Sequence, residues 1–432
     1  MSVSDNNNTK RIIANTLWMI FDKVFMLLLN LLVTVKVANF FGAQGYGNYE
    51  YAVNLVAILE IFVTFVDGRV VKKRYNSVGS DTLVFSATMC RVYFSLISAV
   101  IGIVLILFLG RGREFNWVFI FLLINMVISN LRFGMVNRFE YNLKSKKTVI
   151  AADIAATVGS ILQLFAISLE CSIIVIAAIA AISSLINLIL VIIQYRIEFH
   201  SFGIMKVDNA MVKSLVRESV PLAVAASCAT IYTRCDSVML GGMLTNVEVG
   251  LYAISIKIVS VAQIALGPIR ESVYPKLINL YNIDKEEYGK LYVRLSSFLT
   301  LVCLVGILLS FLILPYCFKF LNEEYLTSLP VYKVLSVSVF FMYNAALRAG
   351  HYTLISRGDI LMYSQIFSVF ANILLNYFFI VAWGIYGAAL ATVCTQFLSL
   401  FVSNLFFGED GKKVFLWQIM ALNPLYIFNR KK

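Results

Sequence analysis

Charged side chains are scarce in this sequence. Asp, Glu, Lys and Arg together make up 14% of its 432 residues, whereas they make up about 25% of an ordinary soluble domain. Apolar side chains reach 60%, and the mean hydropathy is +0.83. This composition excludes a soluble globular protein and also a disordered one, because both need more polar surface.

The residue patterns of metal, redox and phosphate-loop chemistry are also missing. The seven cysteines are scattered without a CxxC pair, so we expect no metal site, no disulfide framework and no cofactor. The two histidines, His200 and His351, lie in or beside expected inner loops and are expected to be solvated. A glycine cluster at Gly42, Gly45 and Gly47 lacks the Lys-Ser/Thr pair of a phosphate-binding loop, so it is predicted to be a turn.

The sequence contains instead a series of long apolar runs. A helix needs about 20 apolar residues to cross roughly 30 Å of hydrocarbon, and runs of about this length recur along almost the whole chain. We therefore predict an all-α polytopic membrane protein with twelve transmembrane helices. The predicted helices cover residues 13–40, 49–70, 82–109, 116–137, 148–169, 172–195, 217–243, 248–269, 292–318, 329–349, 359–382 and 385–407.

The basic residues orient these helices. If the N-terminus is cytoplasmic, most of the 36 lysines and arginines fall in inner segments, and the outer segments hold only Arg111, Arg113 and Lys319. Such an inner excess is typical of membrane proteins. We therefore predict two cytoplasmic termini, attribute the net charge of +12 to topology and expect no nucleic acid partner. The polar N-terminus leads into a long helix, so no cleaved signal peptide is expected.

The chain divides at its longest basic connection, with six predicted helices on each side. Halves with an even number of helices share one orientation, as in repeats related by a pseudo-twofold axis along the membrane normal. A short self-similarity pairs Gly47 with Gly250 and Tyr49 with Tyr252, although Gly and Tyr also both favour the membrane interface. The predicted parts are an N-terminal six-helix lobe over 1–200, a cytoplasmic linker over 201–216, a C-terminal six-helix lobe over 217–408 and a cytoplasmic basic tail over 409–432, which is expected to be interfacial.

Polar side chains recur at helical spacing on predicted helices of both lobes. In lipid, such stripes must face either neighbouring helices or water. Interhelical hydrogen bonds explain a single stripe, whereas stripes in both lobes favour a shared hydrated cavity. We predict that Asn372, Asn376 and Gln396 bind substrate there.

Charges within the predicted helices indicate function, because each costs about 2.5–3.5 kcal/mol at the bilayer centre. Lys36, Glu50, Arg69 and Lys333 lie near helix ends and are expected to reach the interface. The deeper bases suit an anionic, phosphate-bearing substrate. The alternative is that they form internal ion pairs with Asp22, Asp153 or Asp236. The predicted substrate-binding bases are Lys23, Arg91, Arg132, Arg234 and Lys257.

The acidic residues within the helices are candidates for ion coupling. Glu60 and Asp67 lie seven residues apart on one predicted helix, and therefore on one face. The alternative is that they are structural partners of Arg91 or Arg69. The predicted ion-coupling residues are Asp22, Glu60, Asp67, Asp153 and Asp236.

Three segments resemble a known family. They are Val37–Tyr49 (VANFFGAQGYGNY), Val66–Arg69 (VDGR) and the stretch from Arg234 to Tyr252, which holds an aspartate and ends in VGLY. With the twelve predicted helices, they resemble Wzx-type polysaccharide flippases of the multidrug/oligosaccharidyl-lipid/polysaccharide (MOP) exporter superfamily, which have a MATE-like fold.

The resemblance implies a function and a location. Such proteins move an undecaprenyl-pyrophosphate-linked oligosaccharide, an O-antigen or capsule repeat unit, from the cytoplasmic to the outer leaflet of the bacterial inner membrane. They do so by alternating access between two lobes. The implied partners are this lipid-linked sugar, membrane lipid and polysaccharide polymerase machinery.

Other functions stay open at this point. A MATE-like drug or solute antiporter would share the fold, but cationic drugs favour acids over bases, and here bases outnumber acids within the predicted helices. A polysaccharide polymerase or ligase is expected to have a large outer loop, and a lipid II flippase typically has fourteen helices. The sequence shows no nucleotide-binding domain, so an ion gradient or removal of the product would have to drive transport.

Overall fold

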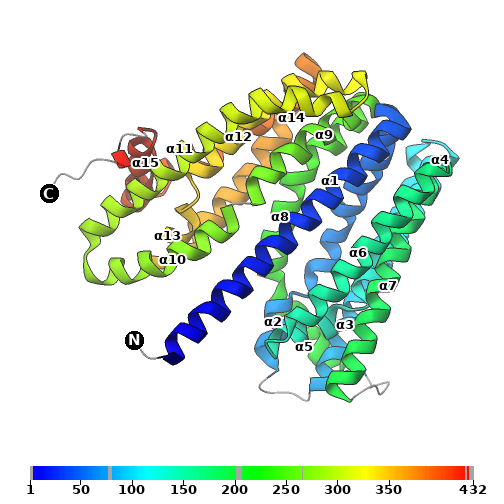
Figure 1. The fold of residues 1–432 in the computed structure, drawn as a ribbon, viewed down its shortest axis with the longest axis horizontal. Coiled ribbons are helices and arrows are strands. Elements are labelled where there is room, and N and C mark those ends of the chain that lie inside the picture. The colour runs from blue at the N-terminus through cyan, green and yellow to red at the C-terminus, as the bar shows by residue number, and fades with distance from the viewer. Residues whose placement is uncertain (1–2, 76–79, 201–206, 265, 424–425, 428–432) are drawn as a thin grey trace. The chain divides into compact units, whose positions relative to one another are not determined.

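A computed structural model describes residues 3–75, 80–200, 207–264, 266–423 and 426–427, with side chains from residue 25 onwards except at residues 80, 268 and 271. Within this part the regular structure is entirely helical (Figure 1), which confirms the predicted all-α class. The α-helices are α1 (Val3–Leu59), α2 (Gly68–Arg74), α3 (Ser80–Leu109), α4 (Arg113–Asn130), α5 (Phe133–Tyr141), α6 (Ser145–Ser168), α7 (Ile173–Phe199), α8 (Asn209–Met243), α9 (Asn246–Ile264), α10 (Leu266–Ile283), α11 (Lys285–Cys317), α12 (Ser328–Asn344), α13 (Arg348–Leu354), α14 (Gly358–Leu400) and α15 (Gly408–Ala421). The 3-10 turns are η1 (Glu60–Phe65), η2 (Phe318–Phe320), η3 (Glu323–Thr327) and η4 (Val402–Phe406).

Ten helical segments in the described part are long and apolar enough to cross a membrane, judged by length and composition. Two of them are much longer than one crossing needs: Phe25–Arg74 has 50 residues and Gly358–Phe406 has 49. Each is interrupted by a glycine with positive φ, at 66° for Gly42 and 57° for Gly384. Glycine adopts such a backbone readily because it has no Cβ. Both segments are therefore pairs of helices, and each has room for two crossings of about 20 residues.

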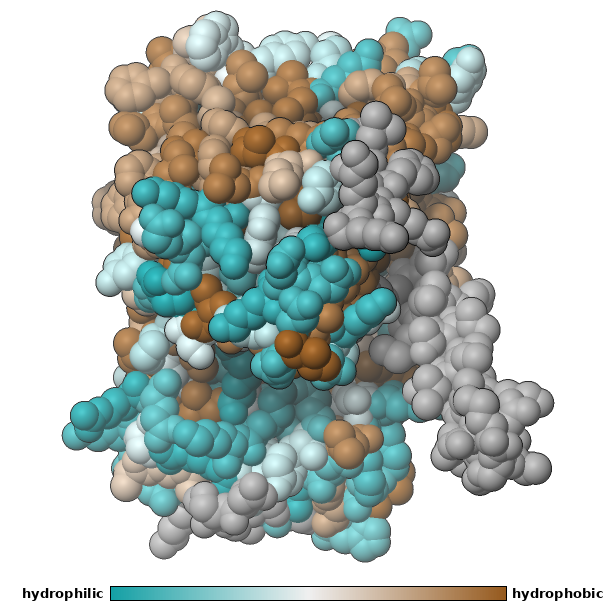
Figure 2. Space-filling model, turned by 90° about the vertical axis from the view of Figure 1, so that its left-hand side faces the viewer, coloured by the Kyte–Doolittle hydropathy of each residue, from teal (hydrophilic) through white to brown (hydrophobic). Residues whose placement is uncertain are grey.

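Large apolar side chains lie exposed on the crossing helices. Leu107 and Phe108 on α3 are 79% and 84% exposed, and Leu312 on α11 and Val381 on α14 are 68% and 72% exposed. Figure 2 shows hydrophobic residues gathered over the upper part of one face and hydrophilic residues gathered below them. Water-soluble proteins rarely expose large apolar patches, so these surfaces suit contact with lipid.

The chain forms two compact units. The first contains residues 1–41 and 65–219, and the second contains residues 42–64 and 220–432. The segment after the Gly42 kink therefore belongs with the C-terminal half of the chain.

In the first unit, α7 packs against α4 and α6. Ser184 on α7 donates a hydrogen bond to Oδ1 of Asn125 on α4 over 2.5 Å, and Ser183 donates to the carbonyl oxygen of Ala155 on α6 over 2.8 Å. Polar side chains join helices in this way when no water is available. Asn125 in the polar stripe of the predicted helix 116–137 thus bonds to a neighbouring helix.

In the second unit, α12 packs against α9, α11 and α14, while α15 packs against α11. The rings of Tyr288, Tyr292, His351 and Trp417 form an aromatic cluster beside these contacts. His351 is only 4% exposed, and its Nδ1 lies 2.7 Å from the Tyr288 hydroxyl. The expectation of a solvated side chain is therefore wrong for His351, because α11 and α15 cover it.

The second unit also contains a very close helix crossing, between the part of α1 after Gly42 and α9. A Cβ atom on Gly47 would lie 1.7 Å from the carbonyl oxygen of Asn246, and one on Gly250 would lie 2.2 Å from that of Ala43. Each glycine also faces the backbone nitrogen of the other. Such reciprocal contacts are those that two elements related by a two-fold axis make. Gly47 and Gly250 are the glycines that the sequence self-similarity pairs.

Candidate functional site

The second unit buries an acidic residue between two bases. Glu50, in α1, is 7% exposed and accepts a hydrogen bond from the Tyr46 hydroxyl over 2.8 Å. Nζ of Lys257, in α9, lies 2.6 Å from the same Glu50 oxygen. The expectation that Glu50 reaches the membrane interface is therefore wrong. The helix begins directly after Gly42 rather than at residue 49, which places Glu50 about two turns inside it.

Arg234 of α8 is the second base. Its Nη1 donates to Oδ1 of Asn54 over 3.2 Å, and Nδ2 of Asn54 donates to the carbonyl oxygen of Glu50 over 2.7 Å. Arg234 is exposed, and the Lys257 side chain is 37% exposed. Among these described residues, two bases surround one carboxylate, so the group as a whole carries one more positive than negative charge. We call Glu50, Asn54, Arg234 and Lys257 the basic cluster.

Asp236 of α8 forms a different arrangement. It is 5% exposed and accepts hydrogen bonds from the Tyr252 hydroxyl (2.8 Å), Thr392 Oγ1 (2.5 Å) and Asn376 Nδ2 (2.7 Å). All three donors are neutral, and no ion pair joins Asp236 to a base in the described part of the chain. The alternative in which Asp236 pairs with a deep base is therefore not what the structure shows. Lys257 pairs with Glu50 instead.

The two other amides predicted to bind substrate, Asn372 and Gln396, lie near these groups. Asn372 is fully buried close to Asp236, but neither of its amide atoms makes a hydrogen bond of ordinary geometry to a described residue. Gln396 is half-buried next to the hydroxyl of Tyr232. The structure thus brings Asn372 and Asn376, both predicted to bind substrate, together with Asp236, which was predicted to couple an ion.

Arg91, Arg132 and Asp153 are predicted site residues that lie in the first unit. The Arg91 guanidinium on α3 lies 4.0 Å from the ring centroid of Phe133. Arg132 is half-buried between α4 and α5, and its Nε is buried without a hydrogen bond to a described residue. Asp153 is half-buried on α6.

The prediction that Glu60 and Asp67 share one helix face is wrong. The α-helix ends at Leu59, η1 follows, and Asp67 is extended, with φ −91° and ψ 133°. Glu60 is exposed, whereas Asp67 caps α2 by accepting from the backbone nitrogen of Arg69 over 2.7 Å. An aspartate at this position starts a new helix, so the predicted helix 49–70 is interrupted here.

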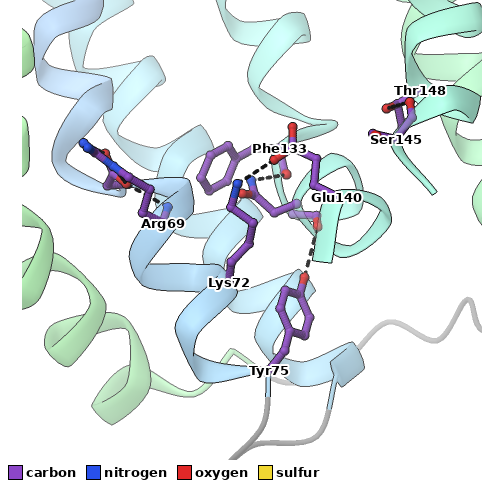
Figure 3. A network of polar contacts seen from close by, with 10 residues as sticks. Arg69, Lys72, Tyr75, Phe133, Glu140, Ser145 and Thr148 are labelled. Carbon is purple, nitrogen blue, oxygen red and sulfur yellow. Dashed lines mark hydrogen bonds and ion pairs between the residues drawn. The ribbon is translucent and has the colours of Figure 1, made fainter. Parts of the chain in front are cut away.

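The Asp67 carboxylate also pairs with the Arg69 side chain at 2.9 Å. Figure 3 shows Arg69 with the neighbouring contacts of α2. Lys72 pairs with Glu140 at 2.7 Å, and the Tyr75 hydroxyl donates to the Gly134 carbonyl oxygen over 3.3 Å, both on α5. Asp67 thus belongs to a structural junction of helix ends. The side chains of Asp22 and Lys23 lie outside the described part of the chain.

Sequence reasoning did not select Arg348 as a candidate site residue. The structure buries it to 5% exposure at the start of α13. Its Nε donates to Asn404 Oδ1 over 2.8 Å, and its Nη2 donates to Ser364 Oγ over 2.8 Å and to Ser403 Oγ over 3.2 Å. The signal in the sequence was the spacing of Ser364 and Ser368, and of Ser399 and Ser403, by one helical turn, which indicates polar partners for a buried base such as Arg348.

The family model described as "Polysaccharide biosynthesis protein" matches residues 12–281, which is more than half of the chain. The chain belongs to this polysaccharide biosynthesis protein family. The resemblance drawn from the sequence is thereby confirmed. No curated protein matches this chain in sequence.

Solved structures identify the fold of this polysaccharide biosynthesis protein as that of the MOP superfamily. An inward-facing multidrug resistance MATE family transporter of that superfamily has a TM-score of 0.68 at 14% identity, over 94% of this chain and 96% of its own. Lipid II flippase MurJ, in an inward closed conformation, has a TM-score of 0.65 at 16% identity, over 96% and 94%. A MOP superfamily transporter from Pyrococcus furiosus has a TM-score of 0.57 at 13% identity, over 94% of each chain. With ten helical segments in its described part that are long and apolar enough to cross a bilayer, this family member is a multi-pass membrane protein.

Proposed function

We propose that this protein flips an undecaprenyl-pyrophosphate-linked oligosaccharide from the cytoplasmic to the outer leaflet of the bacterial inner membrane by alternating access. Membership of the polysaccharide biosynthesis family and the MOP fold support a flippase rather than an enzyme. The observation that carries the proposal is the basic cluster, where Arg234 and Lys257 hold one more charge than Glu50 neutralises.

A pyrophosphate is the substrate group that matches this surplus. Arg offers a planar fork of N–H donors for phosphate oxygens, and Lys offers a compact charge. Two unit charges 4 Å apart interact by about 4 kcal/mol at an effective dielectric constant of 20. Without substrate, Lys257 forms an ion pair with Glu50. A phosphate group of the substrate competes with the Glu50 carboxylate for Lys257. Glu50 therefore offsets one of the two positive charges of the basic cluster, and the remaining positive charge attracts an anion.

The remainder of the substrate fits the chain in kind. Sugar hydroxyls need hydrogen-bonding partners such as Gln396, which stays a proposed contact. Arg91 and Arg132 stay proposed contacts for the anionic part of the substrate. The polyprenyl tail can remain in lipid against the exposed apolar helix surfaces. We propose twelve crossings with both termini cytoplasmic, since α1 and α14 each contain two helices. We also keep the lobes at 1–200 and 217–408, with polymerase machinery as a further partner.

Asp236 is the proposed coupling site. Its carboxylate is surrounded by oxygen and amide groups, and Asn376 Oδ1 is buried without a hydrogen bond to a described residue. Carboxylate, hydroxyl and carboxamide oxygens suit a proton or a small hard cation. We propose that such a cation is bound at Asp236 during the transport cycle and that its gradient drives the step. Asp153 and Asp22 stay candidates of the same kind.

The test is the sidedness of lipid-linked oligosaccharide in cells with and without the protein. Intact spheroplasts are treated with a membrane-impermeant sugar label, and the labelled lipid is quantified. We expect labelled lipid only when the protein is present, with at least a tenfold loss in Arg234→Ala and in the double variant Glu50→Gln, Lys257→Ala. Lys319→Ala is the matched control, because Lys319 is exposed and lies outside the cluster.

Each other outcome overturns the proposal in a different way. Equal losses in all variants, at equal expression, contradict a cationic substrate site. Equal exposure of sugar lipid without the protein, with altered polysaccharide chain length, indicates a polymerase or ligase. Unchanged sugar lipid together with changed drug resistance indicates a MATE-like antiporter.

A further inference from the structure

The halves of α14 before and after Gly384 face each other with polar side chains at intervals of one helical turn, and η4, which holds Ser403, follows the second half. Ser364 and Ser403 lie 3.2 Å apart between their hydroxyl oxygens, and Ser368 donates to Ser399 over 2.5 Å. All four are buried. Because the chain reverses at Gly384, these pairs are successive levels of one antiparallel hairpin.

The same register continues as far as Asp236. It places Asn372 opposite Thr395, and one turn further on Asn376 and Thr392 both donate to the Asp236 carboxylate. We call these levels, from Ser364–Ser403 to Asp236, the polar ladder. At 1.5 Å per residue, residues 364–376 span about 18 Å, which is more than half of a hydrocarbon core of about 30 Å.

One level of the polar ladder lacks hydrogen bonds. At the Asn372–Thr395 level, Asn372 Oδ1 and Nδ2 and Thr395 Oγ1 are buried without a hydrogen bond to a described residue, and at the next level the same holds for Asn376 Oδ1. Buried polar atoms of this kind are normally satisfied by ordered water or by an ion. The unsatisfied atoms of the polar ladder therefore offer binding positions for water or a small cation beside Asp236.

If cations could pass along the whole polar ladder, the coupling cation would cross the membrane without substrate transport. However, Arg348 lies at the Ser364–Ser403 end of the polar ladder. One of its guanidinium nitrogens, Nη2, donates to both serines, and no carboxylate bonds to it in the described part of the chain. Beyond it, Asn404 accepts from Arg348 and donates to Gln418 on α15, so this end is closed by satisfied groups. An arginine side chain stays charged at any physiological pH.

We propose that Arg348 blocks cations at this end of the polar ladder, so that Asp236 exchanges its cation only at the Gly384 end. The inference rests on the proposed cation coupling at Asp236. A cation at the Ser364–Ser403 level would lie about 4 Å from a fixed positive charge. At an effective dielectric constant of 20, that repulsion slows passage by about 100- to 1000-fold. A positively charged side chain excludes cations from narrow water channels by the same physics.

The test measures passive cation leak and needs no lipid-linked sugar. The full-length protein is reconstituted into liposomes, and proton and Na⁺ fluxes under an imposed membrane potential are followed with internal fluorescent dyes. We expect Arg348→Met to leak at least tenfold faster than the wild-type protein, while Arg348→Lys, which keeps the charge, stays tight. Arg348→Gln serves as a second neutral variant should Arg348→Met fail to fold. The ion whose flux rises identifies the conducted cation.

Two further variants tie the leak to this route. Adding Asn372→Leu to the neutral Arg348 variant should close the polar ladder and abolish the leak. Arg357→Met is the matched control, because Arg357 pairs with Asp359 and Asp410 away from the polar ladder, and it should stay tight.

Three results overturn the inference: folded neutral variants as tight as wild type, Arg348→Lys as leaky as the neutral variants, or a leak that persists with Asn372→Leu. None of them depends on sugar transport. A failure of the spheroplast assay is therefore distinguishable from a failure of this inference.

Discussion

Alanine at position 47 tests the closest helix crossing in the second unit. A Cβ atom there would lie 1.7 Å from the Asn246 carbonyl oxygen and 2.7 Å from the Gly250 nitrogen. Real Cβ atoms essentially never lie within 3.0 Å of such atoms, so the two backbones must separate by roughly an ångström. Backbone atoms have no alternative rotamer, and the strain cannot be relieved locally.

The magnitude follows from two opposing effects. Overpacking costs about 1–3 kcal/mol, and a rigid backbone obstacle belongs at the upper end of that range. Alanine in place of glycine within a helix returns up to about 1 kcal/mol. We therefore expect Gly47→Ala to destabilise the protein by about 2 kcal/mol, and Gly250→Ala by a similar amount because the contact is reciprocal.

The assay is thermal unfolding of the purified protein in detergent, followed by tryptophan fluorescence. A loss of about 2 kcal/mol corresponds to an unfolding temperature lower by about 4–8 °C for a unit of this size. Since either alanine already separates the helices, the double variant should lose little more than a single one. Gly306→Ala is the control, because no atom lies within 4 Å of its added Cβ, and it should be neutral or slightly stabilising. Wild-type stability of Gly47→Ala, or fully additive losses, would refute the reasoning.

Contacts within the second unit support three more predictions. Lys257→Met should destabilise the protein by about 1–3 kcal/mol in the same assay, because it removes the lysine that pairs with the buried Glu50. Adding Glu50→Gln should restore most of the lost stability. The expected loss is smaller than for a fully buried pair because the Lys257 side chain is 37% exposed. Asp236→Asn should abolish any dependence of sugar-lipid flipping on an ion gradient while leaving expression unchanged, and an unaltered gradient dependence contradicts the coupling site. Backbone N–H groups of Glu287 and Glu286 hold the pKa of Asp284 below its usual range, so this cap of α11 is intact at neutral pH and is lost only as pH falls through that lowered pKa. Asp284→Ala, but not Asp284→Asn, should therefore speed hydrogen exchange in the first turn of α11 at pH 7.

Much of the fold could be predicted from the sequence. The apolar runs in the sequence located the helices that are long and apolar enough to cross a membrane. The length and apolarity of a run are local properties, and the thickness of the hydrocarbon core sets the length that a crossing needs. The repeat between Gly47 and Gly250 was visible as a pattern. That the two glycines touch was not visible, because a repeat reveals equivalence and not contact.

The wrong predictions at the candidate site came from assumptions about where helices begin and whether they continue. Glu60 and Asp67 were placed on one face by assuming a continuous helix, yet the Asp67 side chain caps a new helix instead. Glu50 was assigned to an interface because the predicted helix began too late. A shift of a few residues at a helix start moves a charge from the interface into the interior.

The sequence by itself determined the all-helical membrane class, the family and the presence of deep charges, because composition and spacing record what the lipid environment demands. Only the tertiary structure decided which charges meet. Glu50 and Lys257 lie far apart in the chain and are joined by packing, and Arg348 is buried by helices that follow it. Burial and pairing depend on the rotation of each helix about its axis and on the neighbour it faces, and neither quantity is contained in the hydropathy of a single segment.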